Sequence, residues 1–315
     1  MRIVVGDAAT LGADLDLSPL SALGEVSVYA ATAPGEMRAR FDGADVAVIN
    51  KLRINRETLG DAPTLKLVCL CATGYDNVDL AFCRAHGIAV CNVVGYSTDS
   101  VAQLTLAMAL SLATNLHAFR AHVAGGAYTE GGVANCLTPV FHELRGKTFG
   151  IVGMGNIGAQ VARVARALGC RVLGFSRTPK PEVENVTLDT LLRESDVVSL
   201  HLPLTEQTRG MIGADEIAKM KKGAILINVA RGAVTDEAAL AEAILSGHLG
   251  GLGVDVYSTE PFPPEHPFFA IRSLPNVCLT PHMAWGACEA RERCLAEVVQ
   301  NIRAFAAGER RSRVD

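Results

Sequence analysis

The sequence predicts an α/β protein with parallel sheets, and two observations support this class. Short apolar runs typical of buried strands alternate with helix-like segments along most of the chain, which is the pattern produced by right-handed crossovers between parallel strands. The 315 residues are 49% hydrophobic and include 30 glycines, as expected of a globular α/β protein with many tight turns. At about 150 residues per domain, this length predicts two domains.

Five strands are expected in the first hundred residues, at 1–5, 26–29, 46–49, 67–70 and 89–92. A long apolar helix is expected over residues 100–118, opened by Thr98, Asp99 and Ser100, which are favourable N-cap residues. The stretch that follows, residues 121–139, is rich in glycine and poorly periodic, and it is predicted to be a loop.

A second α/β series begins at residue 148. Its strands are expected at 148–152, 171–175, 197–201, 224–228, 252–256 and 277–279, with helical segments between them. A last amphipathic helix, over 288–307, is expected to return to the first domain. The predicted domains are therefore a discontinuous one, residues 1–99 with 287–315, and an inserted one, residues 100–286.

Composition argues against several classes of protein. The formal net charge is −4, and no basic run or basic-aromatic stripe indicates a nucleic-acid partner. No stretch of about 18 uncharged apolar residues predicts a membrane span, and the N-terminus has no signal-peptide pattern, so a cytoplasmic location is expected. The nine cysteines are odd in number and lack a disulfide spacing, so reduced thiols and no metal site are expected. Cys69 and Cys71 are expected on opposite faces of a strand.

The segment FGIVGMGNIG, residues 149–158, combines a strand, a G-x-G-x-x-G turn and the start of a helix. The first glycine allows a tight turn, the second lets a pyrophosphate approach the backbone, and the third lets the helix pack on the strand. This context predicts a dinucleotide site; the alternative is a glycine-rich turn that binds nothing. The residues expected to contact the nucleotide are Gly153, Gly155, Asn156, Ile157 and Gly158.

The strand that follows ends where such folds often carry an acidic residue, but Ser176, Arg177 and Thr178 stand there. An acid would repel a 2′-phosphate, whereas an arginine can bind it with two hydrogen bonds and the two hydroxyls can donate to it. These residues favour NADP(H) over NAD(H). The alternative is that Arg177 is simply exposed and that either cofactor binds.

Three titratable side chains follow three successive strands: Arg231, Glu260 and His282. In a doubly wound sheet, ligands bind beyond the carboxyl ends of the strands. Hydride reduction of a 2-keto acid needs a guanidinium for the carboxylate, a histidine to protonate the carbonyl oxygen and a carboxylate to orient that histidine. Each residue alone also has a structural explanation, as a surface charge, a loop residue or a buried histidine, but together they favour a catalytic set.

The chain resembles the D-isomer-specific 2-hydroxyacid dehydrogenases in ordered motifs along nearly its whole length: TGYDNVD, GYSTDSVAQ, GMGNIG, LHLPLTEQTRGMI, INVARG, DVYSTEP and TPHMAW. The resemblance implies two Rossmann-like domains with parallel sheets, namely a doubly wound nucleotide-binding domain and a flavodoxin-like substrate domain. It also implies a homodimer joined through the nucleotide-binding domains. The site residues that it implies are Arg231, Glu260 and His282 for catalysis, the backbone of Thr73 and Gly74 for the substrate carboxylate, Asp255 and the Ala230 carbonyl for the nicotinamide, and His201 and Pro203 for the nucleotide cleft.

Within the family, NKLRIN at residues 50–55 and the TPHMAW ending are similar to glycerate dehydrogenases, also called hydroxypyruvate reductases. Lys51 is placed to reach a terminal hydroxyl of the substrate, or it is an exposed charge at a strand end. Trp285 closes over a small substrate, or it packs between the domains. The loop at Thr73–Gly74 carries no arginine for a substrate phosphate.

The expected function is therefore NADPH-preferring reduction of hydroxypyruvate and glyoxylate to D-glycerate and glycolate, with His282 as the proton donor. One alternative is the same chemistry on pyruvate, a branched 2-keto acid or 3-phosphoglycerate with its keto form, 3-phosphohydroxypyruvate. The other is a non-catalytic protein that binds the nucleotide as a sensor.

Overall fold

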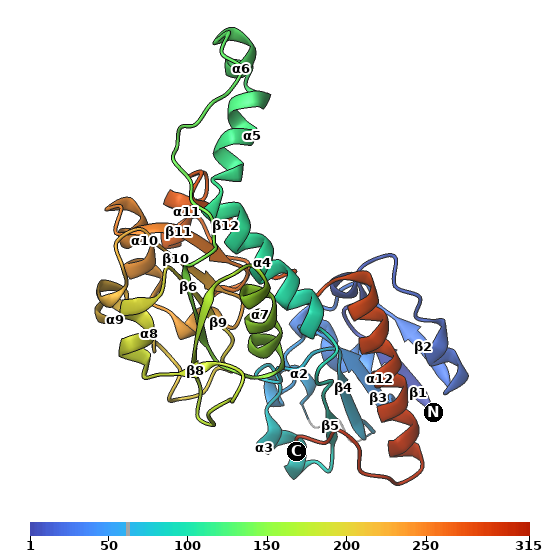
Figure 1. The fold of residues 1–315 in the computed structure, drawn as a ribbon. Helices are drawn as coiled ribbons and strands as arrows, with labels where there is room; N and C mark the ends of the chain where they lie inside the picture. Colours follow the sequence, from blue (N-terminus) through green and yellow to red (C-terminus); the bar gives the residue numbers. More distant parts are fainter. Residues whose placement is uncertain (61–63) are drawn as a thin grey trace. The chain divides into compact units, whose positions relative to one another are not determined.

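The computed structural model describes residues 1–60 and 64–315, and the chain forms two compact units (Figure 1). Unit 1 contains Met1–Ser97 and Trp285–Asp315, and unit 2 contains Thr98–Ala284. These boundaries differ by two residues from the domain limits expected from the sequence, so Trp285 and Gly286 lie in unit 1.

Unit 1 is built on a five-stranded sheet of order β2-β1-β3-β4-β5, in which every pair is parallel. Its strands are β1 (Arg2–Val5), β2 (Glu25–Val28), β3 (Val46–Ile49), β4 (Leu67–Leu70) and β5 (Ala89–Cys91). Its helices are η1 (Ala8–Leu11), η2 (Ser18–Ala22), η3 (Pro34–Glu36), α1 (Met37–Phe41), α2 (Arg56–Leu59), α3 (Leu80–Ala85) and α12 (Cys288–Ala306). Apolar side chains pack on both faces of the sheet, which explains why β3 and β4 are uninterrupted hydrophobic runs.

One expectation about unit 1 is wrong. Cys69 and Cys71 do not point to opposite faces, because residues two apart on a strand share a face. Both belong to the core layer that also contains Cys91 and Cys294, whereas Leu70 packs in the layer on the other face. All nine cysteines are free thiols.

Unit 2 is built on a seven-stranded sheet of order β12-β11-β10-β9-β6-β7-β8, again with parallel pairs throughout. The strands are β6 (Thr148–Val152), β7 (Arg171–Phe175), β8 (Glu184–Asn185), β9 (Val197–Leu200), β10 (Ala224–Asn228), β11 (Leu249–Val254) and β12 (Val277–Leu279). The helices are α4 (Thr98–Ala113), α5 (Leu116–Ala124), α6 (Ala127–Glu130), α7 (Asn156–Ala167), α8 (Leu188–Glu194), α9 (Ala214–Lys219), η4 (Gly232–Val234), α10 (Glu237–Leu245) and α11 (Pro267–Ile271). The α/β class with two parallel sheets, predicted from the sequence, is confirmed.

The long helix expected over residues 100–118 is two helices. Asn115 adopts a left-handed conformation, with φ +52°, between α4 and α5, and the two helices meet at 66°. The loop expected over residues 121–139 is also partly wrong, because the last turn of α5 and all of α6 lie within it, separated by Gly125 and Gly126. In Figure 1, α5 and α6 project from the rest of unit 2 as a helical arm.

Among the described residues, no single helix is both long and apolar enough to cross a bilayer. The bent pair α4 and α5 meets that length and hydropathy only when the two helices are taken together. Seven residues of α4 are buried, which is the pattern of a core helix in a globular protein.

Candidate active site

Arg231, Glu260 and His282 follow β10, β11 and β12, which are consecutive neighbours in the sheet of unit 2. Because the strands are parallel, their carboxyl ends lie at the same edge, and so do the segments that leave them. The loop at Gly153 follows β6 at this edge, and Ser176 and His201 follow β7 and β9. Residues expected for catalysis and for nucleotide binding in unit 2 therefore share one edge of one sheet.

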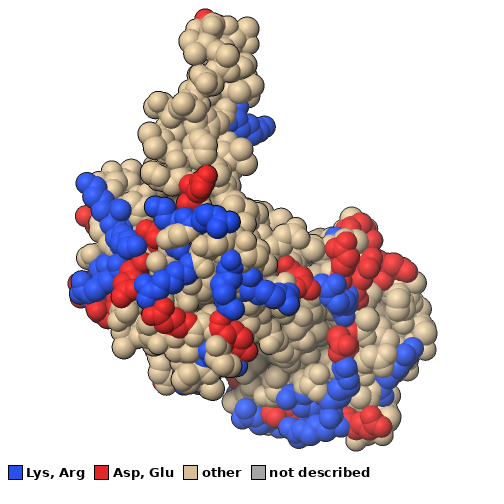
Figure 2. All heavy atoms as spheres, viewed as in Figure 1, with Lys and Arg blue, Asp and Glu red and all other residues tan. Residues whose placement is uncertain are grey.

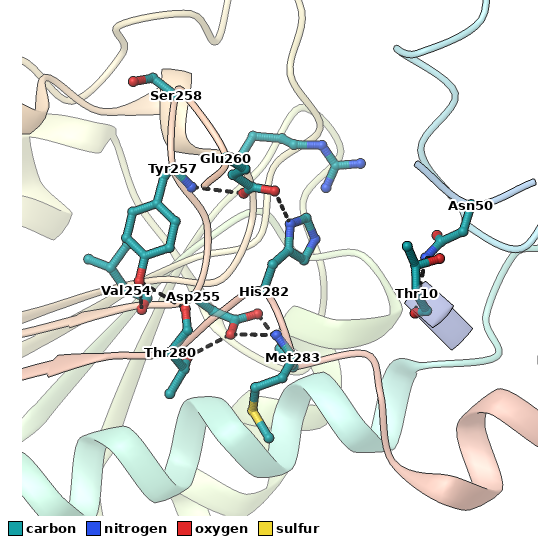
Figure 3. A network of polar contacts seen from close by, with 12 residues as sticks. Thr10, Asn50, Val254, Asp255, Tyr257, Ser258, Glu260, Thr280, His282 and Met283 are labelled. Atoms are coloured by element: carbon teal, nitrogen blue, oxygen red, sulfur yellow. Dashed lines mark hydrogen bonds and ion pairs between the residues drawn. The ribbon is translucent and has the colours of Figure 1, made fainter. Parts of the chain in front are cut away.

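His282 and Glu260 are hydrogen-bonded, with 2.7 Å between His282 Nδ1 and Glu260 Oε2 (Figure 3). The other oxygen of Glu260 accepts a hydrogen bond from the backbone N–H of Tyr257 at 3.0 Å. Both carboxylate oxygens are thus engaged, and the ring of His282 is oriented through Nδ1. Glu260 therefore engages Nδ1 and does not engage the other ring nitrogen, Nε2.

Asp255 holds the turn that carries His282. Its carboxylate is 1% exposed and accepts hydrogen bonds from Thr280 Oγ1 at 2.6 Å and from the backbone N–H groups of Met283 and Ala284 at 2.8 and 2.9 Å (Figure 3). Burial raises the pKa of Asp255, and these hydrogen bonds act in the opposite direction. His282 itself sits in the left-handed region at φ +52°, a conformation that a non-glycine residue adopts only when its surroundings hold it there.

Arg231 lies in a segment packed tightly against the loop after β11. A Cβ at the next residue, Gly232, would overlap the backbone of Tyr257 and Ser258, so only glycine allows this approach. The Arg231 side chain donates to the Ala230 carbonyl at 2.8 Å, and Asn228 Nδ2 donates to the Arg231 carbonyl at 2.9 Å. The Ala230 carbonyl, expected from the sequence to face the nicotinamide, is therefore bonded to Arg231.

The glycine-rich turn fits a pyrophosphate. Gly153 has φ +101°, and a Cβ there would lie 2.6 Å from the His201 carbonyl oxygen. A Cβ at Gly158 would overlap the Gly153 carbonyl, whereas one at Gly155 would meet nothing within 4 Å. No side chain of the described residues caps α7, which begins with Asn156 and Ile157, so its first backbone N–H groups are available to an anion beside the open position at Gly155.

The segment after β7 has no acidic side chain. Ser176 Oγ donates to the Thr178 carbonyl at 2.7 Å, which folds the segment back on itself. The Arg177 side chain is exposed, and within the described residues it makes no hydrogen bond or ion pair. A cavity of about 550 Å³ adjoins this segment. It is lined by Gly174, Phe175, Ser176, Pro179, Asn185, Val186, Thr187 and Thr190.

His201 follows β9 at the same sheet edge. Burial lowers the pKa of His201 to about 3, so its imidazole carries no charge near neutral pH. Its Nε2 lies 2.9 Å from Ser199 Oγ, and its Nδ1 is buried without a partner in the described part of the chain. Pro203, expected in the same cleft, is exposed, and its carbonyl accepts from Thr208 Oγ1 at 2.7 Å.

In unit 1, the expected substrate residues Lys51, Thr73 and Gly74 follow the adjacent strands β3 and β4. The Thr73 hydroxyl donates to the Val93 carbonyl at 2.7 Å. The backbone N–H groups of Thr73 and Gly74 have no acceptor among the described residues. Two backbone N–H groups at a strand end are a suitable receptor for a carboxylate.

Asp7 organises the loop that carries Lys51, and nothing in the sequence indicated this role. Its buried carboxylate accepts from the backbone N–H groups of Asn50, Lys51 and Leu52, the closest at 2.6 Å to Lys51. Burial raises the pKa of Asp7, and these hydrogen bonds oppose the shift.

Trp285 packs within unit 1. Its ring lies against Tyr96 in an edge-on arrangement, with 6.3 Å between the centroids, and against the core layer of α12. These contacts lie within unit 1, and both interpretations of Trp285, closure over a substrate and packing between the domains, stay predictions. Among the described residues, no group of three histidine, cysteine or acidic side chains is placed to hold a metal ion.

A parallel α/β unit with a glycine-rich turn before an uncapped helix, and with an arginine and a histidine–carboxylate pair at the same sheet edge, is typical of nucleotide-dependent oxidoreductases. Residues 106–284 match the D-isomer specific 2-hydroxyacid dehydrogenase, NAD binding domain. The chain belongs to the D-isomer specific 2-hydroxyacid dehydrogenase family.

Relatives along most of the chain are also dehydrogenases and reductases. The chain is 39% identical over 275 residues to the glycerate dehydrogenase of Methylorubrum extorquens, covering 87% of each chain. It is 41% identical to the glyoxylate reductase of Thermococcus litoralis over 82% of this chain and 78% of the relative. It is 37% identical to the hydroxypyruvate reductase of Blautia hydrogenotrophica over 98% of both.

Solved structures show the same fold. The TT0316 protein of Thermus thermophilus superposes with a TM-score of 0.86 at 38% identity, covering all of both chains. The D-lactate dehydrogenase of Aquifex aeolicus, solved with NAD and lactic acid, gives 0.84 at 29% identity, covering 98% of this chain and 96% of that one. An acyclic imino acid reductase (Bsp5), solved with NADPH and D-Arg, gives 0.86 at 26% identity over all of both chains.

Proposed function

We propose that this protein reduces small 2-keto acids, with hydroxypyruvate and glyoxylate foremost, to D-2-hydroxy acids, using NADPH in preference to NADH. The observation that carries the proposal is the His282–Glu260 pair, 2.7 Å apart, at the sheet edge that also presents Arg231 and the glycine-rich turn. The names of the relatives, glycerate dehydrogenase, glyoxylate reductase and hydroxypyruvate reductase, support this substrate class.

The backbone at Gly155–Gly158 would hold the pyrophosphate, and the bound nicotinamide would supply the hydride that forms the new C–H bond. His282 supplies the proton: its Nε2–H bond breaks as the O–H bond of the product forms, and the imidazolium becomes neutral imidazole. Glu260 keeps the ring oriented through Nδ1 and favours the charged form before transfer. His201 is excluded as the proton donor because its pKa of about 3 leaves it unprotonated.

For the substrate carboxylate, unit 2 offers the guanidinium of Arg231, and unit 1 offers the backbone N–H groups of Thr73 and Gly74, which have no acceptor among the described residues. A guanidinium binds a carboxylate with two parallel hydrogen bonds, and backbone N–H groups at a strand end add fixed donors. Lys51 is assigned to the terminal hydroxyl of hydroxypyruvate, because Asp7 fixes its backbone beside β3. Asp255 is assigned two roles: it would bind the carboxamide of the nicotinamide, and it holds the turn that carries His282.

The preference for NADPH rests on the segment after β7. Ser176 stands where an acidic side chain would repel a 2′-phosphate, and the exposed Arg177 is available to pair with one. Among the similar structures, a D-lactate dehydrogenase was solved with NAD and an acyclic imino acid reductase with NADPH, so proteins of similar fold bind either cofactor.

Pyruvate or a branched 2-keto acid would undergo the same chemistry, so these are the alternatives on substrate. A phosphorylated substrate such as 3-phosphohydroxypyruvate is disfavoured, because residues 72–76 contain no cationic side chain that would bind the phosphate.

A homodimer joined through unit 2 is also part of the proposal. The arm formed by α5, α6 and the segment after them exposes apolar side chains, and Figure 2 shows few charged atoms on its visible face. The exposed residues are Leu116, Val123, Tyr128, Val133, Leu137, Val140 and Phe141. Contiguous exposed apolar surface of this kind marks protein interfaces. A cytoplasmic location is proposed because all nine cysteines are free thiols.

Initial rates with purified protein test the proposal. NADPH or NADH is supplied with hydroxypyruvate, glyoxylate, pyruvate or 3-phosphohydroxypyruvate. Fast oxidation of NADPH with hydroxypyruvate or glyoxylate is the expected result. Equal rates with the two cofactors would remove Arg177 from cofactor choice, and tight nucleotide binding without turnover on any keto acid would favour the sensor alternative.

A further inference from the structure

We infer that Glu237, which lies outside the catalytic set, is a positioning residue that holds Glu260 in place through Ser258 and His266. The inference rests on the proposed function, because it concerns the same His282–Glu260 pair. Glu237 begins α10, and its buried carboxylate forms hydrogen bonds with Ser258 and His266, which both lie in the segment that follows β11.

The carboxylate of Glu237 is almost fully buried, with 9% of the side chain exposed. Its Oε1 accepts a hydrogen bond from the Ser258 backbone N–H at 2.8 Å, and its Oε2 accepts from the Ser258 hydroxyl. Oε2 also lies 3.0 Å from His266 Nε2. Three donors therefore converge on one buried carboxylate, which is what a charge needs in order to remain ionised away from water.

The protonation state of His266 follows from its second contact. Its Nδ1 accepts a hydrogen bond from the Phe268 backbone N–H at 3.2 Å and so caps the N-terminus of α11. A nitrogen that accepts carries no proton, so Nε2 must carry it and donate to Glu237. His266 is therefore neutral. Its two hydrogen bonds connect the Glu237 carboxylate to the N-terminus of α11.

These anchors lie on both sides of the catalytic carboxylate in the chain. Ser258 precedes Glu260 by two residues and His266 follows it by six, so Glu237 fixes both ends of the segment that carries Glu260. The Tyr257 ring packs against Phe262 and His266, with centroids 4.8 and 6.2 Å apart, and its hydroxyl donates to the Thr280 carbonyl at 2.8 Å. The same loop therefore also contacts the turn of His282.

A displaced Glu260 would change the electrostatics of His282 in a way that simple destabilisation would not. Glu260 lies 2.7 Å from the imidazole, the Asp255 carboxylate interacts with His282 from beneath its turn, and Arg231 follows β10 at the same sheet edge. Of these, Glu260 is the one that lies between the two anchors of Glu237, Ser258 and His266. Moving Glu260 away removes a negative neighbour, so the imidazolium loses its proton at a lower pH.

The Glu237→Gln variant tests this idea with almost unchanged shape. An amide cannot accept from Ser258 N–H, Ser258 Oγ and His266 Nε2–H at once, because one of its two polar atoms is itself a donor. Glu242→Gln is the matched control, since it makes the same change at an exposed position on the same helix. His266→Asn is the second variant, because asparagine can still cap α11 but loses the bond to Glu237.

The measurement is kcat/KM for 2-keto acid reduction as a function of pH, with folding checked by near-UV circular dichroism and cofactor affinity by fluorescence titration. The His282→Ala variant is measured first, so failure of the proposed function is seen there and not at Glu237. For Glu237→Gln and His266→Asn, kcat/KM is expected to fall about tenfold or more, with cofactor affinity unchanged. The alkaline limb is expected to move to lower pH by about half a unit or more. An alkaline limb that stays at the wild-type pH in both folded variants would overturn the inference, as would an equal shift in Glu242→Gln.

Discussion

The imidazole of His282 and the carboxylate of Glu260 lie 2.7 Å apart although 22 residues separate them in the chain. They come together because β11 and β12 are neighbours in a parallel sheet, so the segments leaving both strands start at the same edge. Two further contacts hold the geometry: Tyr257 N–H on Glu260, and Asp255 beneath the turn of His282. The order of the strands thus brings the two side chains together, and hydrogen bonds from Tyr257 and to Asp255 fix their positions.

Replacing Glu260 tests the pair directly. The Glu260→Gln variant keeps the size of the side chain but removes the charge that favours the imidazolium form of His282. We expect kcat/KM for reduction to fall by roughly ten- to a hundredfold and its alkaline limb to move to lower pH. Steady-state rates between pH 6 and 9 measure both effects. An unchanged pH profile would mean that Glu260 does not influence the proton donor.

A substitution at Gly155 tests nucleotide binding without disturbing the fold. A Cβ at this position meets nothing within 4 Å, so Gly155→Ala is expected to fold as wild type does, with a free energy of unfolding within about 1 kcal/mol. The added methyl would occupy the space through which a pyrophosphate approaches the backbone, so dinucleotide affinity should fall at least tenfold. Gly35→Ala is the matched control, because its Cβ also meets no atom within 4 Å. Equal cofactor affinity in both variants would place the pyrophosphate elsewhere.

Ser176 offers a test of cofactor choice. The Ser176→Asp variant introduces a carboxylate at the end of β7, where it can accept hydrogen bonds from ribose hydroxyls and repel a 2′-phosphate. The ratio of kcat/KM for NADPH to that for NADH is expected to fall by about tenfold or more. Arg177→Ser should lower the same ratio by weakening NADPH alone. If neither variant changes the ratio, the segment after β7 does not contact the 2′-position.

His201 makes stability depend on pH in a defined direction. Its pKa is about 3 in the folded protein, whereas an imidazole in the unfolded chain titrates at about 6.5. Between these values the unfolded chain binds more protons, so the free energy of unfolding decreases as pH falls below about 6.5. The His201→Gln variant, which cannot be protonated, should lose less stability between pH 7.5 and 5. Urea unfolding at the two pH values measures this, and an equal loss in both proteins would contradict the burial of His201.

Much of the fold could be predicted because its strands are mostly apolar: β3, β4, β6, β7, β10 and β12 have the expected limits. The missed strand, β8, is a two-residue exposed segment with no hydrophobic pattern. The break between α4 and α5 was missed because the left-handed conformation of Asn115 depends on its surroundings and not on the apolar pattern.

Residues of the candidate site could be predicted where a titratable side chain follows the end of a predicted strand. Arg231, Glu260 and His282 each stand a few residues after a predicted strand, and parallel pairing brings such positions to one edge. Glu237 and His266 could not be found in this way, because neither follows a strand and a buried hydrogen bond between distant segments leaves no local pattern. Asp7 was missed for a similar reason, since its importance lies in the three backbone N–H groups that surround it.

The central claim is that His282 protonates the oxygen of a 2-keto acid. The most direct test compares His282→Ala with wild type in NADPH oxidation by hydroxypyruvate, alongside NADPH binding followed by fluorescence. Rapid wild-type turnover to D-glycerate, with a loss of at least about a hundredfold in the variant and unchanged NADPH affinity, is the predicted result. A variant that turns over hydroxypyruvate at nearly the wild-type rate would contradict it.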